Sequence, residues 1–185
     1  LTAFMASISA FYKKIPVAHV EAGLRTNNIY DPFPEEANRR LITQIASLHF
    51  APTKDAENLL YSIGVKENVY LTGNTVIDSL KFFSNNSEAP QINGLNYEND
   101  LLVLASIHRR ENWGNKLLDI LKGIKNILES NKEVKFVIPL HPNKIVRDPI
   151  LDFLKNNKRV FLIEPLRYDL LIGLMKKCKL ILTDS

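Results

Sequence analysis

Polar side chains gather in three short segments of the sequence, each directly after an apolar run. The segments are Val20-Glu-Ala-Gly-Leu-Arg25, Ile107-His-Arg-Arg-Glu-Asn-Trp-Gly114 and Leu140-His-Pro-Asn143. They supply carboxylates and imidazoles that can move protons, together with cations that can hold phosphates. That combination suits chemistry on a phosphorylated or nucleotide-bearing substrate. The candidate site residues are therefore Glu21, Arg25, His108, Arg109 and His141.

A further acidic segment, Asp31-Pro-Phe-Pro-Glu-Glu-Ala-Asn-Arg-Arg40, has the features of a helix start. We expect Pro34 at the first helical position, and the two acids after it lie where the helix dipole favours negative charge. At about 100° per residue, Glu35 falls on the side of Ile42, whereas Glu36 points the opposite way. The pattern predicts that Glu35 is partly buried and Glu36 is solvated. A carboxylate near apolar neighbours tends to have a raised pKa, which suits proton transfer at neutral pH.

Several of these residues also have an explanation without chemistry. His19 and His49 fall inside apolar runs, so a core role explains them better than catalysis. For His108 and His141, function and simple loop hydrogen bonding explain the pattern equally well. Turns and a close approach to phosphate likewise both account for Gly23, Gly73 and Gly114.

Short apolar runs alternate with amphipathic segments along the chain, which predicts an α/β fold with parallel sheets covered by helices on both faces. The predicted strands are 16–20, 47–51, 68–72, 101–107, 134–140, 160–163 and 179–183. The predicted helices are 2–12, 35–46, 53–63, 75–84, 115–131, 143–157 and 167–177. The polar stretch 85–99 breaks this rhythm and is predicted to be a surface excursion. Because open α/β sheets bind ligands at the carboxyl ends of their strands, the three polar segments lie where a site belongs.

The composition narrows the class of protein. The chain has 185 residues, 45% of them hydrophobic and 24% charged, which indicates a soluble globular protein and excludes collagen, coiled coil and general disorder. No apolar run approaches the roughly 20 residues of a membrane-spanning helix, and no signal peptide is evident. The single cysteine, Cys178, argues against an internal disulfide and against a Cys-based metal site. We expect a cytoplasmic protein.

The formal net charge of +4 comes from residues 74–185, because residues 1–73 hold equal numbers of acidic and basic side chains. The excess is diffuse, without basic runs interleaved with aromatic residues. It therefore argues against a nucleic-acid partner and fits a small anionic ligand or no ligand at all.

Taken together, the chemical segments resemble the non-hydrolysing UDP-N-acetylglucosamine 2-epimerases. The resemblance is carried by His19-Val-Glu-Ala-Gly-Leu-Arg-Thr26, Pro34-Glu-Glu-Ala-Asn-Arg39, Thr72-Gly-Asn-Thr-Val-Ile-Asp78, His108-Arg-Arg-Glu-Asn112, Leu140-His-Pro-Asn143 and Leu182-Thr-Asp-Ser185. It implies a GT-B architecture of two Rossmann-like domains with parallel sheets. Residues 1–73 would be the C-terminal part of the first domain, and residues 74–185 the N-terminal part of the second, UDP-binding domain.

The resemblance also implies an activity: reversible epimerisation at C2 of UDP-N-acetylglucosamine to UDP-N-acetylmannosamine, for cell-surface polysaccharide precursors. UDP is eliminated to leave a 2-acetamidoglucal and is then added back, with no metal or nicotinamide cofactor. Glu21 and Glu35 match the family's two glutamates and would be acid and base, in either order. His108 matches its active-site histidine. The substrate-binding candidates are Arg25, Arg109, His141 and Ser185, with Arg109 serving the nucleotide or the regulatory site of bacterial members. The resemblance also implies a homodimer, because dimers are usual in the family.

Some features of the family are missing. The chain has neither the Gly-Thr-Arg-Pro-Glu loop nor the Gly-Gly-Ile-Gln-Glu-Glu segment that hold much of the phosphate and ribose, and Leu171 stands where relatives often carry a phenylalanine. We therefore expect a fragment that is inactive by itself. The alternatives are an epimerase for another UDP-2-acetamido sugar, a hydrolysing relative and a non-catalytic nucleotide-sugar-binding fragment. Two motifs favour N-acetylglucosamine as the sugar of the substrate: Glu21-Ala-Gly-Leu-Arg25 and Phe33-Pro-Glu-Glu36.

Overall fold

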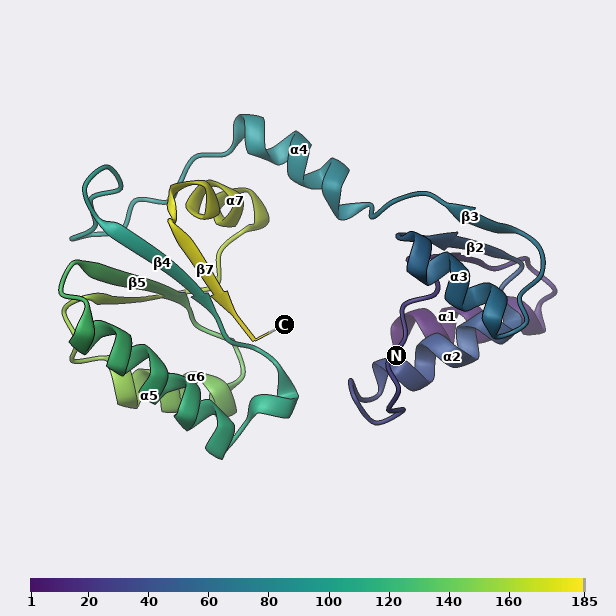
Figure 1. Cartoon of the computed structure of the whole chain (residues 1–185), viewed down its shortest axis with the longest axis horizontal. Helices are drawn as coiled ribbons and strands as arrows, with labels where there is room; N and C mark the ends of the chain where they lie inside the picture. Colours follow the sequence, from purple (N-terminus) through teal and green to yellow (C-terminus); the bar gives the residue numbers. More distant parts are fainter. Residues whose placement is uncertain (185) are drawn as a thin grey trace. The chain divides into compact units, whose positions relative to one another are not determined.

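Two parallel sheets organise the chain, each with helices on both of its faces (Figure 1). The structure is a computed structural model that describes residues 1–184. The residues divide into two compact units with the boundary between Ser79 and Leu80, within helix α4 (Val76–Asn86). Each unit is described by itself.

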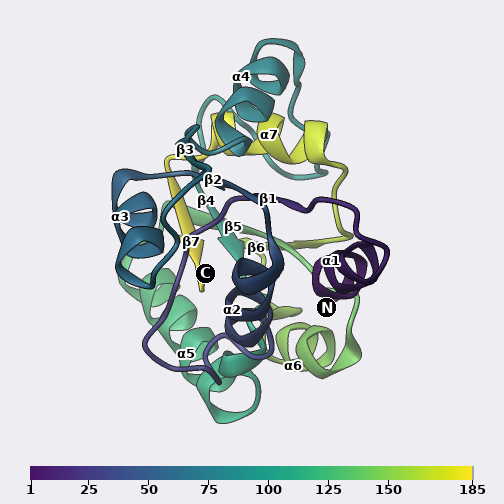
Figure 2. The same cartoon turned by 90° about the vertical axis from the view of Figure 1, so that its right-hand side faces the viewer.

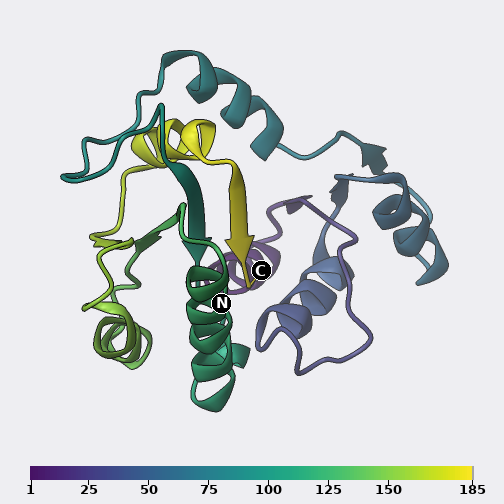
Figure 3. The same cartoon turned by 60° about the vertical axis from the view of Figure 1, so that its left-hand side comes forward.

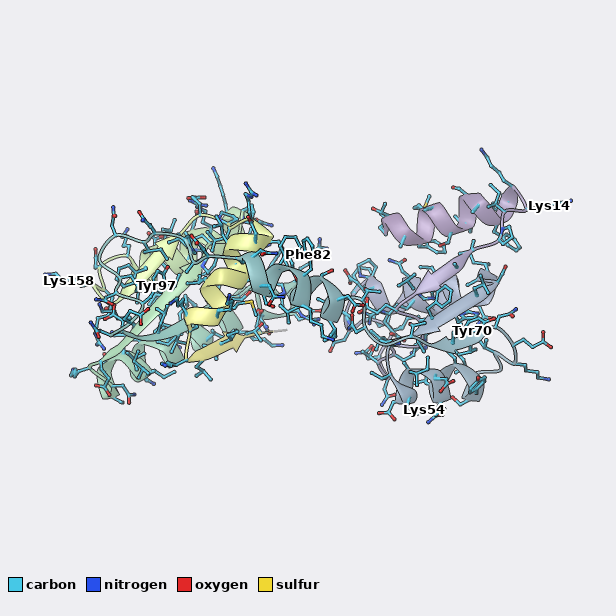
Figure 4. The ribbon with its side chains drawn as sticks, turned by 90° about the horizontal axis from the view of Figure 1, so that it is seen from above. Lys14, Lys54, Tyr70, Phe82, Tyr97 and Lys158 are labelled. Carbon is cyan, nitrogen blue, oxygen red and sulfur yellow. The ribbon has the colours of Figure 1, made fainter. Side chains whose placement is uncertain are left out.

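The first unit contains a three-stranded parallel sheet in the order β1-β2-β3. Its elements are α1 (Thr2–Tyr12), β1 (Ala18–Val20), α2 (Glu35–Ile45), β2 (Leu48–Ala51), α3 (Lys54–Ser62) and β3 (Val69–Leu71). Helices α1 and α2 pack side by side (Figure 2). Figure 4 shows α1 on one side of this sheet and α3, which begins at the labelled Lys54, on the other.

Small residues allow α3 to pack closely on the sheet. The Thr53 hydroxyl caps the helix by accepting the Ala56 N–H at 3.1 Å. Ala56 and Leu60 are buried against Ala22 and Ala51, which follow or end the adjacent strands. Gly23 lies in the turn after β1 with φ +86°, and a Cβ atom there would overlap the Ala56 carbonyl group, 2.8 Å from its carbon. The turn that carries Glu21 is thus pressed against the first turn of α3.

Gly23→Ala is expected to destabilise the protein strongly, because it combines a left-handed φ with a clash against backbone. The matched control is Gly64→Ala, in the same unit, where φ is +94° but nothing lies within 4 Å of the added Cβ. We expect a loss of about 1 kcal/mol of unfolding free energy for the control and about 3 kcal/mol or more for Gly23→Ala. Urea unfolding measures both, and equal losses would contradict the close approach.

The second unit contains a four-stranded parallel sheet in the order β6-β5-β4-β7. Its strands are β4 (Leu101–Ser106), β5 (Val134–Pro139), β6 (Val160–Ile163) and β7 (Leu180–Thr183). Its helices, after α4, are the short 3-10 turn η1 (Arg110–Asn112), α5 (Asn115–Ser130), α6 (Lys144–Leu154) and α7 (Tyr168–Lys177). Helices α5 and α6 cover one face, and α7 covers the other (Figure 1).

Strand β4 lies at the centre of this unit and is buried on both faces, which explains its continuous apolar sequence. Val103 and Ala105 join the core under α5 and α6, while Leu102 and Leu104 join the core under α7. Strand β7 runs parallel beside β4, with Ser106 opposite Thr183 (Figure 3). The chain segments that leave β4 and β7 therefore start next to each other.

The predicted α/β class, strands and helices are confirmed, with ends shifted by three residues or fewer. Two details differ. Pro34 is the N-cap of α2, one position before the helix, rather than its first residue. Apart from Asn85 and Asn86, which end α4, the stretch 85–99 has no regular structure, but Ile92, Leu95 and Tyr97 pack on the α7 core, which its polar composition did not indicate. Within residues 1–184, no helix is long and apolar enough to cross a membrane.

Candidate active site

Glu21 is the first residue after β1 and has an unusual backbone. Its φ of +64° lies in the left-handed region, which non-glycine residues seldom occupy and which is enriched at functional sites. The next residue fixes this geometry, because Ala22 is fully buried and donates its N–H to the Phe50 carbonyl at 2.9 Å. The carboxylate of Glu21 is left exposed at the carboxyl end of the strand.

The expected burial of the two glutamates of α2 is wrong: Glu35 is exposed and Glu36 is fully buried. The helical period places Glu35 on the side of Ile42, which is indeed buried. At the first turn, however, the loop after β1 covers the other side of the helix. The helical period of α2 contains no information about that loop. Of the two glutamates, Glu35 is the one whose side chain stays exposed to solvent.

The buried Glu36 carboxylate ties the loop after β1 to α2. It accepts the Nε–H of Arg40 at 2.7 Å and the backbone N–H of Thr26 at 3.2 Å. Arg40 completes the link by donating to the Thr26 carbonyl at 3.1 Å. A buried charge requires partners of this kind, so Glu36 has a structural role in this unit.

Arg25 is half-buried and is bound within its own unit. Its guanidinium donates to the Thr43 hydroxyl and, at 2.8 Å, to the Leu24 carbonyl. Burial lowers the pKa of Arg25, with Glu36 acting in the opposite direction and the cations of Arg40 and Arg39 adding to the lowering. With Arg40 it lines a cavity of about 410 Å³ between α2 and α3. Its predicted role in substrate binding stays a prediction.

His19 and His49 are paired neighbours on the adjacent parallel strands β1 and β2. His49 is buried, His19 is half-buried, and the Nδ1 atoms of both are without a hydrogen-bond partner among residues 1–184. Burial, together with His49, Arg25 and Arg39, lowers the pKa of His19 to about 4. Burial also lowers the pKa of His49. Both rings are therefore neutral in the folded protein at physiological pH.

This histidine pair predicts a loss of stability in mild acid. Between about pH 6.5 and 4 the unfolded chain binds a proton at His19 that the folded chain does not, so the unfolding free energy falls as pH decreases. His19→Gln removes this contribution and is expected to give a shallower decline between pH 7 and 5, measured by urea midpoints. Parallel curves for the two proteins in that range would contradict the assignment.

In the second unit, the ends of β4, β5 and β7 bring the predicted histidines together. His108 follows β4 and His141 follows β5, and both line a cavity of about 470 Å³. Much of its wall is apolar and includes Leu166 and Leu171 near the start of α7. The volume falls within the usual range for small-molecule sites.

The Asp184 carboxylate organises the chain after β4 and was missed by the sequence analysis as a site residue. It accepts the backbone N–H of His108 at 3.1 Å, that of Arg109 at 2.9 Å and the side-chain amide of Asn112 at 3.1 Å. Burial by itself raises the pKa of Asp184, but these bonds and the nearby His108 ring hold it below its ordinary value. The signal that could have found it is the β4–β7 pairing, which the sequence pattern does not reveal.

His141 is held by the chain that follows it. Its Nδ1 accepts the backbone N–H of Asn143 at 3.0 Å, and Asn143 in turn caps α6 through Ile145. Arg109 is half-buried and contributes its backbone N–H to the Asp184 cluster. The predicted site residue Ser185 lies outside the described residues. In the part of the chain that the structure describes, no three His, Cys, Asp or Glu side chains form a group that could hold a metal ion.

Comparisons with known proteins agree with this geometry. The family model described as UDP-N-acetylglucosamine 2-epimerase matches residues 1–185. The UDP-N-acetylglucosamine 2-epimerases of Neisseria meningitidis and Bacillus subtilis are 44% and 41% identical over the whole chain, which covers 52% and 48% of their lengths. The chain thus spans about half the length of these relatives.

Solved structures show the same fold. The Neisseria meningitidis enzyme bound to UDP-GlcNAc is 42% identical over 98% of this chain and 51% of its own, with a TM-score of 0.90. The Methanocaldococcus jannaschii enzyme in complex with UDP-GlcNAc and UDP is 34% identical over 100% of this chain and 52% of its own, with a TM-score of 0.80. The fold is that of the GT-B class, with its Rossmann-like parallel sheets. Within that class, the chain belongs to the UDP-N-acetylglucosamine 2-epimerase family.

Proposed function

We propose that the protein containing this chain interconverts UDP-N-acetylglucosamine and UDP-N-acetylmannosamine by eliminating and re-adding UDP. The family match along all 185 residues carries this proposal. In it, residues 1–73 belong to the first Rossmann-like domain and residues 74–185 to the second, which holds UDP. The protein is a cytoplasmic homodimer and supplies precursors for cell-surface polysaccharide, as the family resemblance implies.

Glu21 and Glu35 are the proposed proton-transfer groups of the first unit. Inversion at C2 requires one group to remove a proton from one face and another to return it to the opposite face. Both carboxylates are exposed, and they come from different segments, one after β1 and one at the start of α2. Glu36 is unsuited to this role because it is buried and paired with Arg40.

The cavity of the second unit is the proposed binding site of the nucleotide. Apolar side chains such as Leu166 and Leu171 suit the uracil ring, whereas the two histidines can meet oxygen atoms of the diphosphate or the sugar. Elimination leaves negative charge on the departing UDP. A hydrogen-bonding or protonated His108, with the cation of Arg109 beside it, would stabilise that charge.

Proton NMR of UDP-N-acetylglucosamine in heavy water, with the full-length protein, tests the reaction. Deuterium at C2 together with UDP-N-acetylmannosamine is the expected result. Free N-acetylmannosamine plus UDP would indicate a hydrolysing enzyme instead. A folded protein that binds UDP but exchanges no hydrogen would show that the sugar is different or that the protein only binds.

The two adjacent glutamates of α2 provide a matched pair of variants. Glu35→Gln is expected to lower kcat by at least about 100-fold while the melting temperature changes little, because its carboxylate is exposed. Glu36→Gln is expected to lower the unfolding free energy by about 2 kcal/mol, because the buried carboxylate loses its charge-assisted hydrogen bonds to the partly exposed Arg40 and to the Thr26 N–H. Calorimetry and the C2 exchange rate separate the two effects, and the reverse assignment would refute the proposed roles.

The 185-residue chain alone is expected to bind UDP without turning over the sugar nucleotide. Its second unit contains the whole cavity, but the chain spans only about half the length of its relatives. A rise in melting temperature with UDP measures binding, and NMR measures turnover. An unchanged melting temperature of the folded chain would place the nucleotide elsewhere.

A further inference from the structure

The two histidines that line the cavity of the second unit use the same ring atom in opposite ways. Nδ1 of His108 lies 3.3 Å from a carboxylate oxygen of Asp184 and 3.4 Å from the Ser106 hydroxyl. Nδ1 of His141 accepts a backbone N–H, that of Asn143, at 3.0 Å. A carboxylate favours a proton on the nitrogen that faces it, whereas an N–H donor requires a lone pair. The neutral rings therefore differ in tautomer.

This difference determines what each ring offers to a bound ligand. His108 holds its proton on Nδ1 and presents Nε2 as an acceptor, or as a charged donor once the ring is protonated beside Asp184. The neutral ring of His141 accepts at Nδ1, so it holds its proton on Nε2 and offers that nitrogen as a donor. Both side chains line the cavity.

We propose that Asp184 is the positioning residue that sets the tautomer and orientation of His108, so that His108 can exchange a proton or carry charge while His141 only donates. The proposal rests on the proposed function, for which His108 faces the departing UDP. Three further donors hold the carboxylate in place: the backbone N–H groups of His108 and Arg109 and the Asn112 amide. Its side chain is only 6% exposed, against 45% for His108, so water competes little at the carboxylate.

The arrangement of donors around Asp184 predicts the effect of a single isosteric change. The Oδ2 atom accepts the shortest bond, from Arg109, and the Asn112 amide, whereas Oδ1 is the oxygen nearest to the His108 ring. In Asp184→Asn, the amide oxygen is expected to take the Oδ2 position, where the backbone N–H groups of His108 and Arg109 and the Asn112 amide all reach it. The amide NH2 then faces Nδ1 of His108 and requires a lone pair there. The variant should thus convert His108 to the tautomer of His141.

Nitrogen-15 NMR of the full-length protein, labelled at histidine, reads both tautomers directly. His108→Gln and His141→Gln assign the two sets of signals. In the unmodified protein we expect the Nδ1–H form at His108 and the Nε2–H form at His141. In Asp184→Asn we expect Nε2–H at both positions, with the His141 signals unchanged as an internal control of folding.

The matched control is Asn112→Ala, which removes one donor to Asp184 without altering the group that faces Nδ1. It should keep the Nδ1–H form of His108. Asp184→Asn should lower kcat by at least about 100-fold and change KM much less, as expected when the wrong tautomer is imposed on an otherwise intact site.

Two results would overturn the proposal. An Nε2–H signature at His108 in the unmodified protein does so without any variant, even if Asp184→Asn fails to fold. An unchanged Nδ1–H signature in folded Asp184→Asn does so as well. Failure of the proposed function is distinct, because the tautomers would then be as expected while no deuterium enters C2.

Discussion

Parallel pairing of β4 with β5 on one side and β7 on the other is the constraint on which the second unit depends. All three strands are oriented the same way, so the segments that leave them begin at one edge of the sheet. His108 and Asp184 are 76 positions apart in sequence, yet the register of Ser106 with Thr183 brings them into contact. Side-chain size in β4 fixes that register, because a slip of one residue would place Leu102 and Leu104 where the smaller Val103 and Ala105 pack under α5 and α6.

The first unit meets the same requirement by other means. Its strands are short, and the chain after β1 is long and irregular, so backbone pairing alone does not hold it. The buried carboxylate of Glu36 supplies the missing link through Arg40 and Thr26. The contact of Gly23 with the backbone of Ala56 fixes the turn before it. Glu36 thus has a structural role, whereas Glu21 and Glu35 stay exposed to solvent, where a substrate can reach them.

In both units, the surroundings of a histidine ring determine where its proton lies. Two neutral histidines stay within the first sheet because burial disfavours their charged forms. At the edge of the second sheet, His108 faces a buried carboxylate, and His141 faces a backbone donor. Burial thus sets the proton arrangement of the two histidines in the first sheet, whereas the atom next to Nδ1 sets that of His108 and of His141.

The sequence by itself determined the α/β class, the order of helices and strands, and the three segments at which strands end in polar residues. These features depend on local periodicity and on turn chemistry, which act over a few residues. Only the tertiary structure decided that Glu36 rather than Glu35 is buried and that Asp184 joins the His108 turn. Both depend on segments that meet across the fold, a loop over α2 in one case and the neighbouring strand β7 in the other. Periodicity along one element carries no information about which other element will cover it.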